Sequence, residues 1–184
     1  MVTLLAGVAA YSVLFTLVIA VVEHLRAPRA LPAALVAHGV LPRAGAVLVA
    51  ACVIAAETAL GIVLLVGLLG VTGVVPVALV ASGVLFACYG GYGLLVISTG
   101  RVGPCGCGGV EVPMDGWVAG RAFALAVMAL SAAASGTVPQ LTTFDSPLLV
   151  TLLAAATFTA LLWQLPAARH DRLDDRSALR SVAP

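Results

Sequence analysis

Five long apolar runs constrain the fold of this chain more than any other feature of its sequence. A helix needs roughly 20 apolar residues to cross the hydrocarbon core of a bilayer, and the five runs approach or exceed that length. Only 9% of the 184 residues are charged, whereas soluble domains carry about 25%. A soluble fold cannot bury this much apolar surface, so we expect a single integral membrane domain. The runs cover residues 2–22, 44–69, 74–97, 118–135 and 148–165.

The expected fold is all-α. No segment alternates polar and apolar residues as the strands of a membrane barrel do, so the runs are read as transmembrane helices. Residues 1–168 are expected to form a polytopic helical bundle in the lipid bilayer, and residues 169–184 a charged, flexible tail. The short apolar stretch 31–40 lies among prolines and is expected to form a small helix in the membrane interface. The net charge of +1 gives no indication of a nucleic-acid partner.

The arginines predict an orientation. The chain has nine basic residues and no lysine, and with five spans all nine fall on one side of the membrane. Cytoplasmic loops collect basic residues, so we expect the N-terminus outside and the C-terminus in the cytoplasm. The connection at residues 98–117 is then also cytoplasmic. The nine are Arg26, Arg29, Arg43, Arg101, Arg121, Arg169, Arg172, Arg176 and Arg180.

Residues 100–109, GRVGPCGCGG, place Cys105 and Cys107 one glycine apart in this polar connection. A disulfide between them closes a small ring far from relaxed geometry, and strained disulfides are the labile, oxidising ones. Such a bond adds little stability, because the loop it closes is so short. A redox pair is therefore the favoured interpretation. Inert thiols remain an alternative, as does a metal site that would need further ligands such as Glu111 or Asp115.

Glu57 lies near the middle of the second apolar run. An ionisable residue at that depth is costly and suggests a function, and hydrocarbon surroundings favour its neutral form. As a neutral acid it can hydrogen-bond a quinone or relay protons. The alternative is a helix-packing residue held by hydrogen bonds. Expected partners are Tyr11, Tyr89, Tyr92 and Arg121.

The remaining candidates are two cysteines and two histidines. Cys52 and Cys88 lie about 12–14 Å from the same membrane face by helical rise, so a second thiol pair is one hypothesis. The other is that both are small buried hydrophobic residues. His24 and His38 are expected either to mark the water boundary or to transfer protons near the thiol loop, together with Arg121.

Three segments carry a family resemblance: RAPRALPAALVAHGVLP before the second run, AAETALGIVLL within it, and GRVGPCGCGG before the fourth. Over roughly residues 4–134 they resemble the MauE branch of the DoxX-like membrane proteins. The resemblance implies a four-helix bundle, to which the fifth span is an addition, in the bacterial cytoplasmic membrane. It points to Cys105 and Cys107 as a redox pair, Glu57 as the acid of the second span, and Pro42 as the loop proline.

The function implied by this resemblance is thiol–disulfide redox chemistry. The Cys105–Cys107 pair would exchange electrons with a thioredoxin-like partner, and with a quinone, during maturation of a redox enzyme such as methylamine dehydrogenase. The expected activity is that of a thiol–disulfide oxidoreductase. Two alternatives stay open: a non-catalytic anchor subunit of a larger oxidoreductase complex, and a metal-handling protein that uses the two thiolates. An exported substrate would need the thiols outside, whereas the arginines place them inside.

Overall fold

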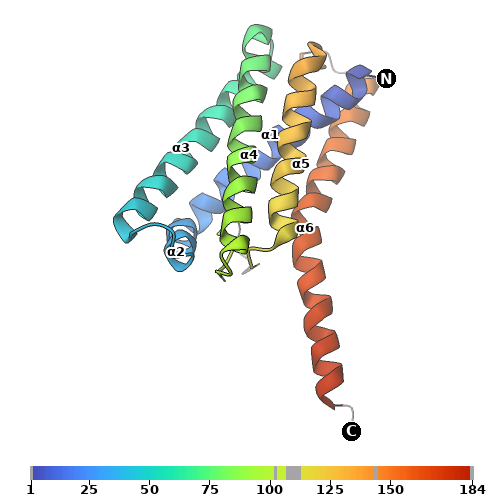
Figure 1. The fold of residues 1–184 in the computed structure, drawn as a ribbon. Coiled ribbons are helices and arrows are strands. Elements are labelled where there is room, and N and C mark those ends of the chain that lie inside the picture. The colour runs from blue at the N-terminus through green and yellow to red at the C-terminus, as the bar shows by residue number, and fades with distance from the viewer. Residues whose placement is uncertain (1, 102, 107–112, 143–144, 183–184) are drawn as a thin grey trace.

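The computed structural model describes residues 2–101, 103–106, 113–142 and 145–182, and over these residues the regular structure is helical with a single isolated bridge. Five helices are long and apolar enough to cross a membrane, the last of them through Ser146–Gln164. The expected polytopic all-α fold is thus confirmed (Figure 1). The elements are α1 (Val2–Arg26), α2 (Ala30–Ala37), α3 (Arg43–Leu68), η1 (Thr72–Val74), α4 (Val75–Ser98), α5 (Gly116–Ser135) and α6 (Ser146–Val182).

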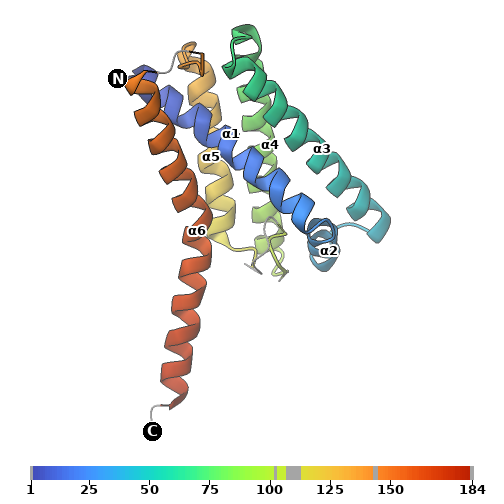
Figure 2. The same cartoon turned by 180° about the vertical axis from the view of Figure 1, so that it is seen from behind.

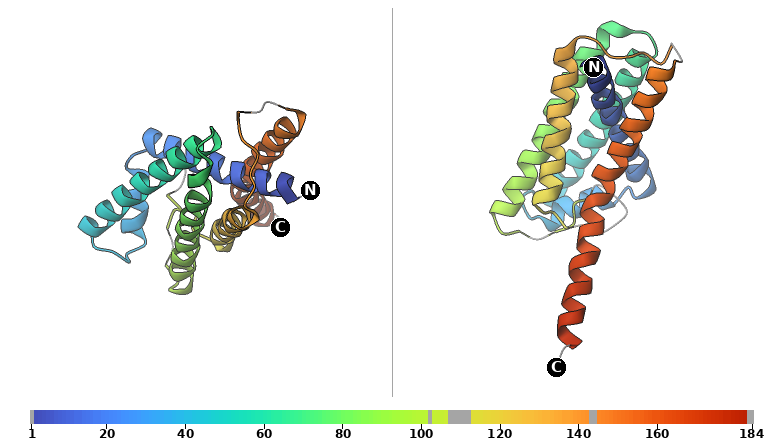
Figure 3. Two further views of the ribbon diagram at one scale, coloured as in Figure 1. Left: turned by 90° about the horizontal axis from the view of Figure 1, so that it is seen from above. Right: turned by 90° about the vertical axis from the view of Figure 1, so that its right-hand side faces the viewer.

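Helix α1 organises the bundle. It crosses the other spans obliquely and packs against α3, α5 and α6, as the view from behind shows (Figure 2). Helices α4 and α5 run side by side and form the most extensive helix pair (Figures 1 and 3). Helix α3 packs on α1, α2 and α4 but not on α6. The arrangement leaves the cavity described below between α1, α3, α4 and α5.

The α4–α5 contact depends on glycine. A Cβ atom added to Gly90 would lie 2.8 Å from the ring of Phe123, and one added to Gly83 would lie 2.9 Å from Leu130. Membrane helices lack a hydrophobic driving force between them, so close backbone approach and van der Waals packing hold such pairs together. These glycines therefore bring α4 close enough to α5 for the two helices to form one rigid wall.

Two connections and the end of α6 lie at the same end of the bundle (Figure 1). The turn through α2 and the segment between α4 and α5 are both there, so the arginines of these connections gather at one end. Arg121 lies in the second turn of α5, at the same end. With five spans, the first and third connections and the C-terminal segment must lie on the same side. The structure accordingly brings these arginine-bearing segments to one end of the bundle.

Helices α2 and α6 add detail to what the sequence predicted. Helix α2 forms within the expected stretch, but Leu31 and Leu35 are buried in a cluster with α3 rather than lying only on the interface. Helix α6 continues to Val182 and projects beyond the bundle (Figure 3), while the expected division into a bundle at residues 1–168 and a charged, flexible tail at 169–184 stays a prediction. Arginine, leucine and alanine are strong helix formers and are frequent in this segment, which accounts for the continued helix.

Candidate functional site

A cavity of about 320 Å³ opens inside the end of the bundle that carries the basic connections. Each of the six α-helices contributes to its lining, which is mainly aliphatic and aromatic. A mostly apolar pocket with a few convergent polar groups is the usual form of a small-molecule site. The groups that can carry chemistry are His24, His38, Glu57, Cys88, Cys105 and Arg121.

Glu57 is the innermost ionisable group of this cavity. Helix α3 holds its side chain in the bundle, where only 3% of the residue is exposed. The Tyr89 hydroxyl donates a hydrogen bond of 2.9 Å to Oε1, and Nε2 of His24 lies 3.1 Å from Oε2. That second contact has the distance of an ion pair but lacks hydrogen-bond alignment, so Oε2 has no hydrogen-bond partner among the described residues.

The Glu57–His24 pair can hold a single proton in two ways. Either the acid and the imidazole are both neutral, or the proton has moved and they form an ion pair. Both arrangements have no net charge, so each avoids the large cost of an isolated charge at membrane depth. A buried acid next to an imidazole is therefore suited to receive or release a proton.

Arg121 reaches the same cavity from α5. Its guanidinium lies 5.0 Å from the centre of the Trp163 ring on α6, which is a cation–π distance. No carboxylate among the described residues lies within ion-pair distance of it. The guanidinium therefore keeps donor capacity that the described protein groups do not use.

His38 anchors the thiol loop to the bundle. It is 2% exposed, and its Nε2 lies 3.0 Å from the carbonyl oxygen of Pro104 while its Nδ1 lies 3.0 Å from the Tyr92 hydroxyl. A carbonyl can only accept, so Nε2 carries the proton, and in the neutral ring Nδ1 accepts from Tyr92. The guanidinium of Arg101 also donates to the His38 carbonyl at 3.0 Å.

Helix α4 links these two clusters. Tyr89 and Tyr92 are three residues apart, which places them on one helix face about 4.5 Å apart along the axis. Tyr89 contacts the acid and Tyr92 contacts the histidine that holds the loop. The acid cluster and the loop cluster are thus stacked along a single wall of the cavity.

The loop itself is closely fitted to α2. Gly106 has a φ of +73°, and a Cβ atom there would lie 2.7 Å from the Cβ of Ala34, so only glycine fits both the backbone and the space. The loop ends are joined by the bridge between Pro104 and Pro113 and by the 2.9 Å bond from Met114 N–H to the Gly103 carbonyl. These contacts fix the backbone on both sides of Cys105.

Cys105 is buried at 8% exposure and lines the cavity. Cys107 and Glu111 lie outside the described residues, so the expected Cys105–Cys107 pairing stays a prediction. Cys52 and Cys88, the expected second pair, are both exposed, so the alternative that they are small buried residues is wrong. Cys88 also lines the cavity, whereas Cys52 on α3 does not. The structure therefore brings Cys88 and Cys105 to one cavity and leaves Cys52 outside it.

The metal interpretation receives no support from the described residues. Asp115 caps the N-terminus of α5, where its Oδ1 accepts hydrogen bonds of 3.0 Å from the N–H groups of both Trp117 and Val118. Within the described ranges no three histidine, cysteine or acidic side chains lie together as metal ligands do. Asp115 therefore has a structural task that the sequence pattern did not reveal.

Sequence reasoning found the acid but missed one of its two contacts. Of the four expected partners of Glu57, Tyr89 is the one that bonds it, while Tyr11 donates to the Pro139 carbonyl at 2.8 Å. His24 was assigned to the membrane boundary or to proton transfer, and not to Glu57. A signal was present, because His24 lies on the same α1 face as the buried Leu17 and Ala20.

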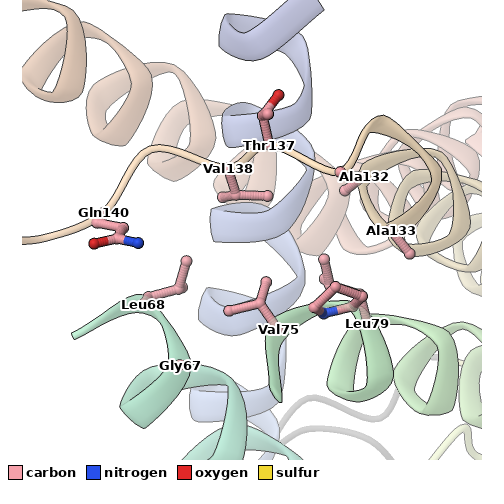
Figure 4. A pocket seen from close by; sticks show the side chains of 11 residues that line it. Gly67, Leu68, Val75, Leu79, Ala132, Ala133, Thr137, Val138 and Gln140 are labelled. Carbon is pink, nitrogen blue, oxygen red and sulfur yellow. The ribbon is translucent and has the colours of Figure 1, made fainter. Parts of the chain in front are cut away.

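A second cavity, of about 250 Å³, is lined by the end of α3, the start of α4 and the end of α5, which lie at the opposite end of the bundle. Figure 4 shows its lining. Leu68, Val75 and Leu79 point into it from α3 and α4, and Val138 closes it from the α5–α6 connection. Among the residues that the structure describes, no ionisable side chain and no cysteine lines this cavity. The reactive groups are therefore concentrated at the end that carries the thiol loop.

Comparison with known proteins gives one family match. Residues 2–137 match the family described as Methylamine utilisation protein MauE. Searches of curated proteins and of solved structures return no match. The matched segment runs from α1 through α5 and includes every cavity-lining residue except Trp163. Since the match spans most of the chain and its cavity, the chain belongs to the MauE family of multi-pass membrane proteins involved in methylamine utilisation.

Proposed function

We propose that this protein is a membrane thiol–disulfide redox protein that acts in the maturation of a redox enzyme of methylamine utilisation. Cys105 and Cys107 form the reactive pair, and a thioredoxin-like protein is the partner. The observation that carries the proposal is the anchoring of the backbone next to Cys105. His38 bonds the Pro104 carbonyl and is itself bonded by Tyr92 and Arg101, at a cavity that also contains a buried acid. A subunit that served only as an anchor would not need this arrangement.

The exchange takes place between the dithiol of the reduced partner and the Cys105–Cys107 disulfide, and it balances in electrons and protons. A thiolate of the reduced partner attacks one sulfur of the Cys105–Cys107 disulfide and forms a mixed disulfide, while the other sulfur leaves as a thiolate. The second partner thiol then attacks the mixed disulfide. The partner ends with a disulfide, and Cys105 and Cys107 end as a dithiol that has taken up two electrons and two protons.

For the orientation we propose the bacterial cytoplasmic membrane, with the N-terminus outside and the thiol loop in the cytoplasm. The support is the gathering of the arginine-bearing segments at one end of the bundle. A membrane-impermeant maleimide should then label Cys105 in opened cells and not in intact cells, after reduction. A variant with a single cysteine engineered in the α3–α4 turn provides the control, since it should be labelled in intact cells. Equal labelling of Cys105 in intact cells would reverse the orientation.

The test of the redox proposal is a trapping experiment. Cys107→Ser should accumulate a mixed disulfide between Cys105 and its partner in non-reducing gels, and reductant should release the partner for identification. Cys52→Ser is the matched control, since Cys52 lies outside the cavity and should leave the wild-type behaviour unchanged. Full alkylation of both loop thiols in freshly isolated membranes, under oxidising as well as reducing conditions, would favour the anchor subunit instead.

A further inference from the structure

We propose that the cavity at the thiol-loop end binds the ring of a membrane-soluble quinone, with Arg121 on one side and the Glu57–His24 pair on the other. Binding stands on the structure alone, whereas the electron transfer described below rests on the proposed function. The cavity lies among the membrane-spanning helices and its lining is mainly apolar, which suits a ligand that is soluble in the bilayer. Its volume of about 320 Å³ is at the lower end of the range for small-molecule pockets, roughly 300–1,000 Å³.

The unused hydrogen-bonding capacity indicates what kind of ligand fits. Oε2 of Glu57 is buried without a hydrogen-bond partner among the described residues. Its 3.1 Å contact with Nε2 of His24 is not aligned as a hydrogen bond, so this oxygen keeps hydrogen-bonding capacity that a ligand in the cavity can use. When Oε2 carries the proton of the pair, it is a donor.

Arg121 supplies donors from a different helix. It comes from α5, whereas Glu57 and His24 come from α3 and α1, so polar groups reach the cavity from separate helices. A quinone accepts hydrogen bonds at two carbonyl oxygens on opposite sides of one flat apolar ring. Phe86 and Trp163 add aromatic surface to the lining, on which such a ring can stack.

The loop that carries Cys105 borders the same cavity. Cys105 lines the cavity together with the acid and the arginine. In the oxidation step the two S–H bonds of the Cys105–Cys107 dithiol break and one S–S bond forms. Two electrons pass to the quinone and its two carbonyl oxygens each gain a proton, giving a quinol. The Glu57–His24 pair supplies a proton to the nearer oxygen. Of the two protons that the thiols release, one restores the pair and the other goes to the farther oxygen, so atoms and charge balance.

Binding can be measured without any redox chemistry. The chain has two tryptophans, of which Trp163 lines the cavity and Trp117 does not. In a variant with all four cysteines replaced by serine or alanine, a short-chain quinone should quench tryptophan fluorescence saturably. Trp163→Phe should remove the saturable part and leave the emission of Trp117. Quenching that rises linearly with quinone, with no saturable part, would overturn the inference.

Arg121→Gln should weaken the quinone affinity by roughly 10- to 150-fold, which is the range for loss of a hydrogen bond from a charged donor. Arg26→Gln is the matched control, because Arg26 is exposed, pairs with Glu23 at 3.2 Å and does not line the cavity; the quinone affinity of this variant should stay within about twofold. If palmitate displaced the quinone and itself bound more tightly through Arg121, the cavity would be a site for lipid carboxylates, and the inference would be wrong.

A second experiment, on thiol oxidation, distinguishes failure of the quinone inference from failure of the proposed redox function. In the protein with its cysteines intact, quinone should convert the loop dithiol to a disulfide with one quinol formed per disulfide. Glu57→Gln keeps hydrogen-bonding groups but cannot titrate, so it should keep the quinone affinity and slow this step. Quinone binding without thiol oxidation would contradict the proposed function alone. Thiol exchange with a protein partner, in a protein that does not bind quinone, would contradict this inference alone.

Discussion

His38→Ala should release the thiol loop from the bundle. The wild-type imidazole connects the Tyr92 hydroxyl on α4 to the carbonyl of Pro104, the residue before Cys105. Alanine removes both contacts and leaves the α2 backbone in place. The Arg101 bond to the backbone carbonyl at position 38 does not depend on the side chain and can persist. The change therefore acts on the loop more than on the bundle.

The magnitude follows from the two lost hydrogen bonds. Each contributes about 0.5–1.5 kcal/mol net, so the closed position of the loop should weaken by about 1–3 kcal/mol. This corresponds to roughly a 5- to 150-fold larger population of the open loop. Cys105 is only 8% exposed when the loop is closed, so reagents reach its thiol mainly in the open state.

The assay is the rate of Cys105 alkylation in a variant that keeps Cys105 as its single cysteine. His38→Ala should raise that rate by about 5- to 150-fold, in line with the open population. His24→Ala is the matched control, since it removes another buried histidine of the cavity that contacts Glu57 and not the loop. An unchanged rate in a His38→Ala protein that keeps its wild-type thermal midpoint would refute the reasoning that His38 holds the loop.

Two further predictions concern the scaffold. Gly90→Val should overpack the α4–α5 contact against Phe123 at a cost of about 1–3 kcal/mol and lower the thermal midpoint in detergent. Gly91→Val, where nothing lies within 4 Å of the added Cβ, should leave the midpoint close to wild type, and equal midpoints would contradict the packing assignment. Asp115→Ala should remove the N-cap of α5 and destabilise the protein by about 0.5–2 kcal/mol in chemical unfolding, whereas Asp115→Asn should retain most of the stability. Equal losses in both Asp115 variants would show that the charge matters and not the cap.

The spans were readable from the sequence because the bilayer imposes one length and one chemistry. A helix that crosses hydrocarbon satisfies its own backbone and needs about 20 apolar residues, so apolar runs predict helices directly. The expected run at residues 44–69 and helix α3 at Arg43–Leu68 differ by one residue at each end. The end of α6 was harder, since the segment beyond Gln164 is rich in charged residues and the bilayer gives no signal there.

Residue type alone marked Glu57, His38 and Cys105 as candidates. A carboxyl group in an apolar run and a thiol in a glycine-rich loop are unusual enough to be noticed without a fold. Residue type did not reveal which groups meet. Of four expected partners of Glu57 the structure selects Tyr89, and it adds His24, which lies 33 positions earlier in the chain.

The sequence by itself therefore determined the number of spans, the shared end of the basic segments and the identity of the unusual polar residues, because each depends on local composition. Tertiary structure decided that α1 crosses α3 so that His24 meets Glu57, and that His38 holds the Pro104 carbonyl. It also decided that Cys88 faces the cavity while Cys52 does not. These outcomes depend on helix rotation and crossing, which side-chain packing between helices sets and which apolar composition, nearly uniform around each span, leaves open.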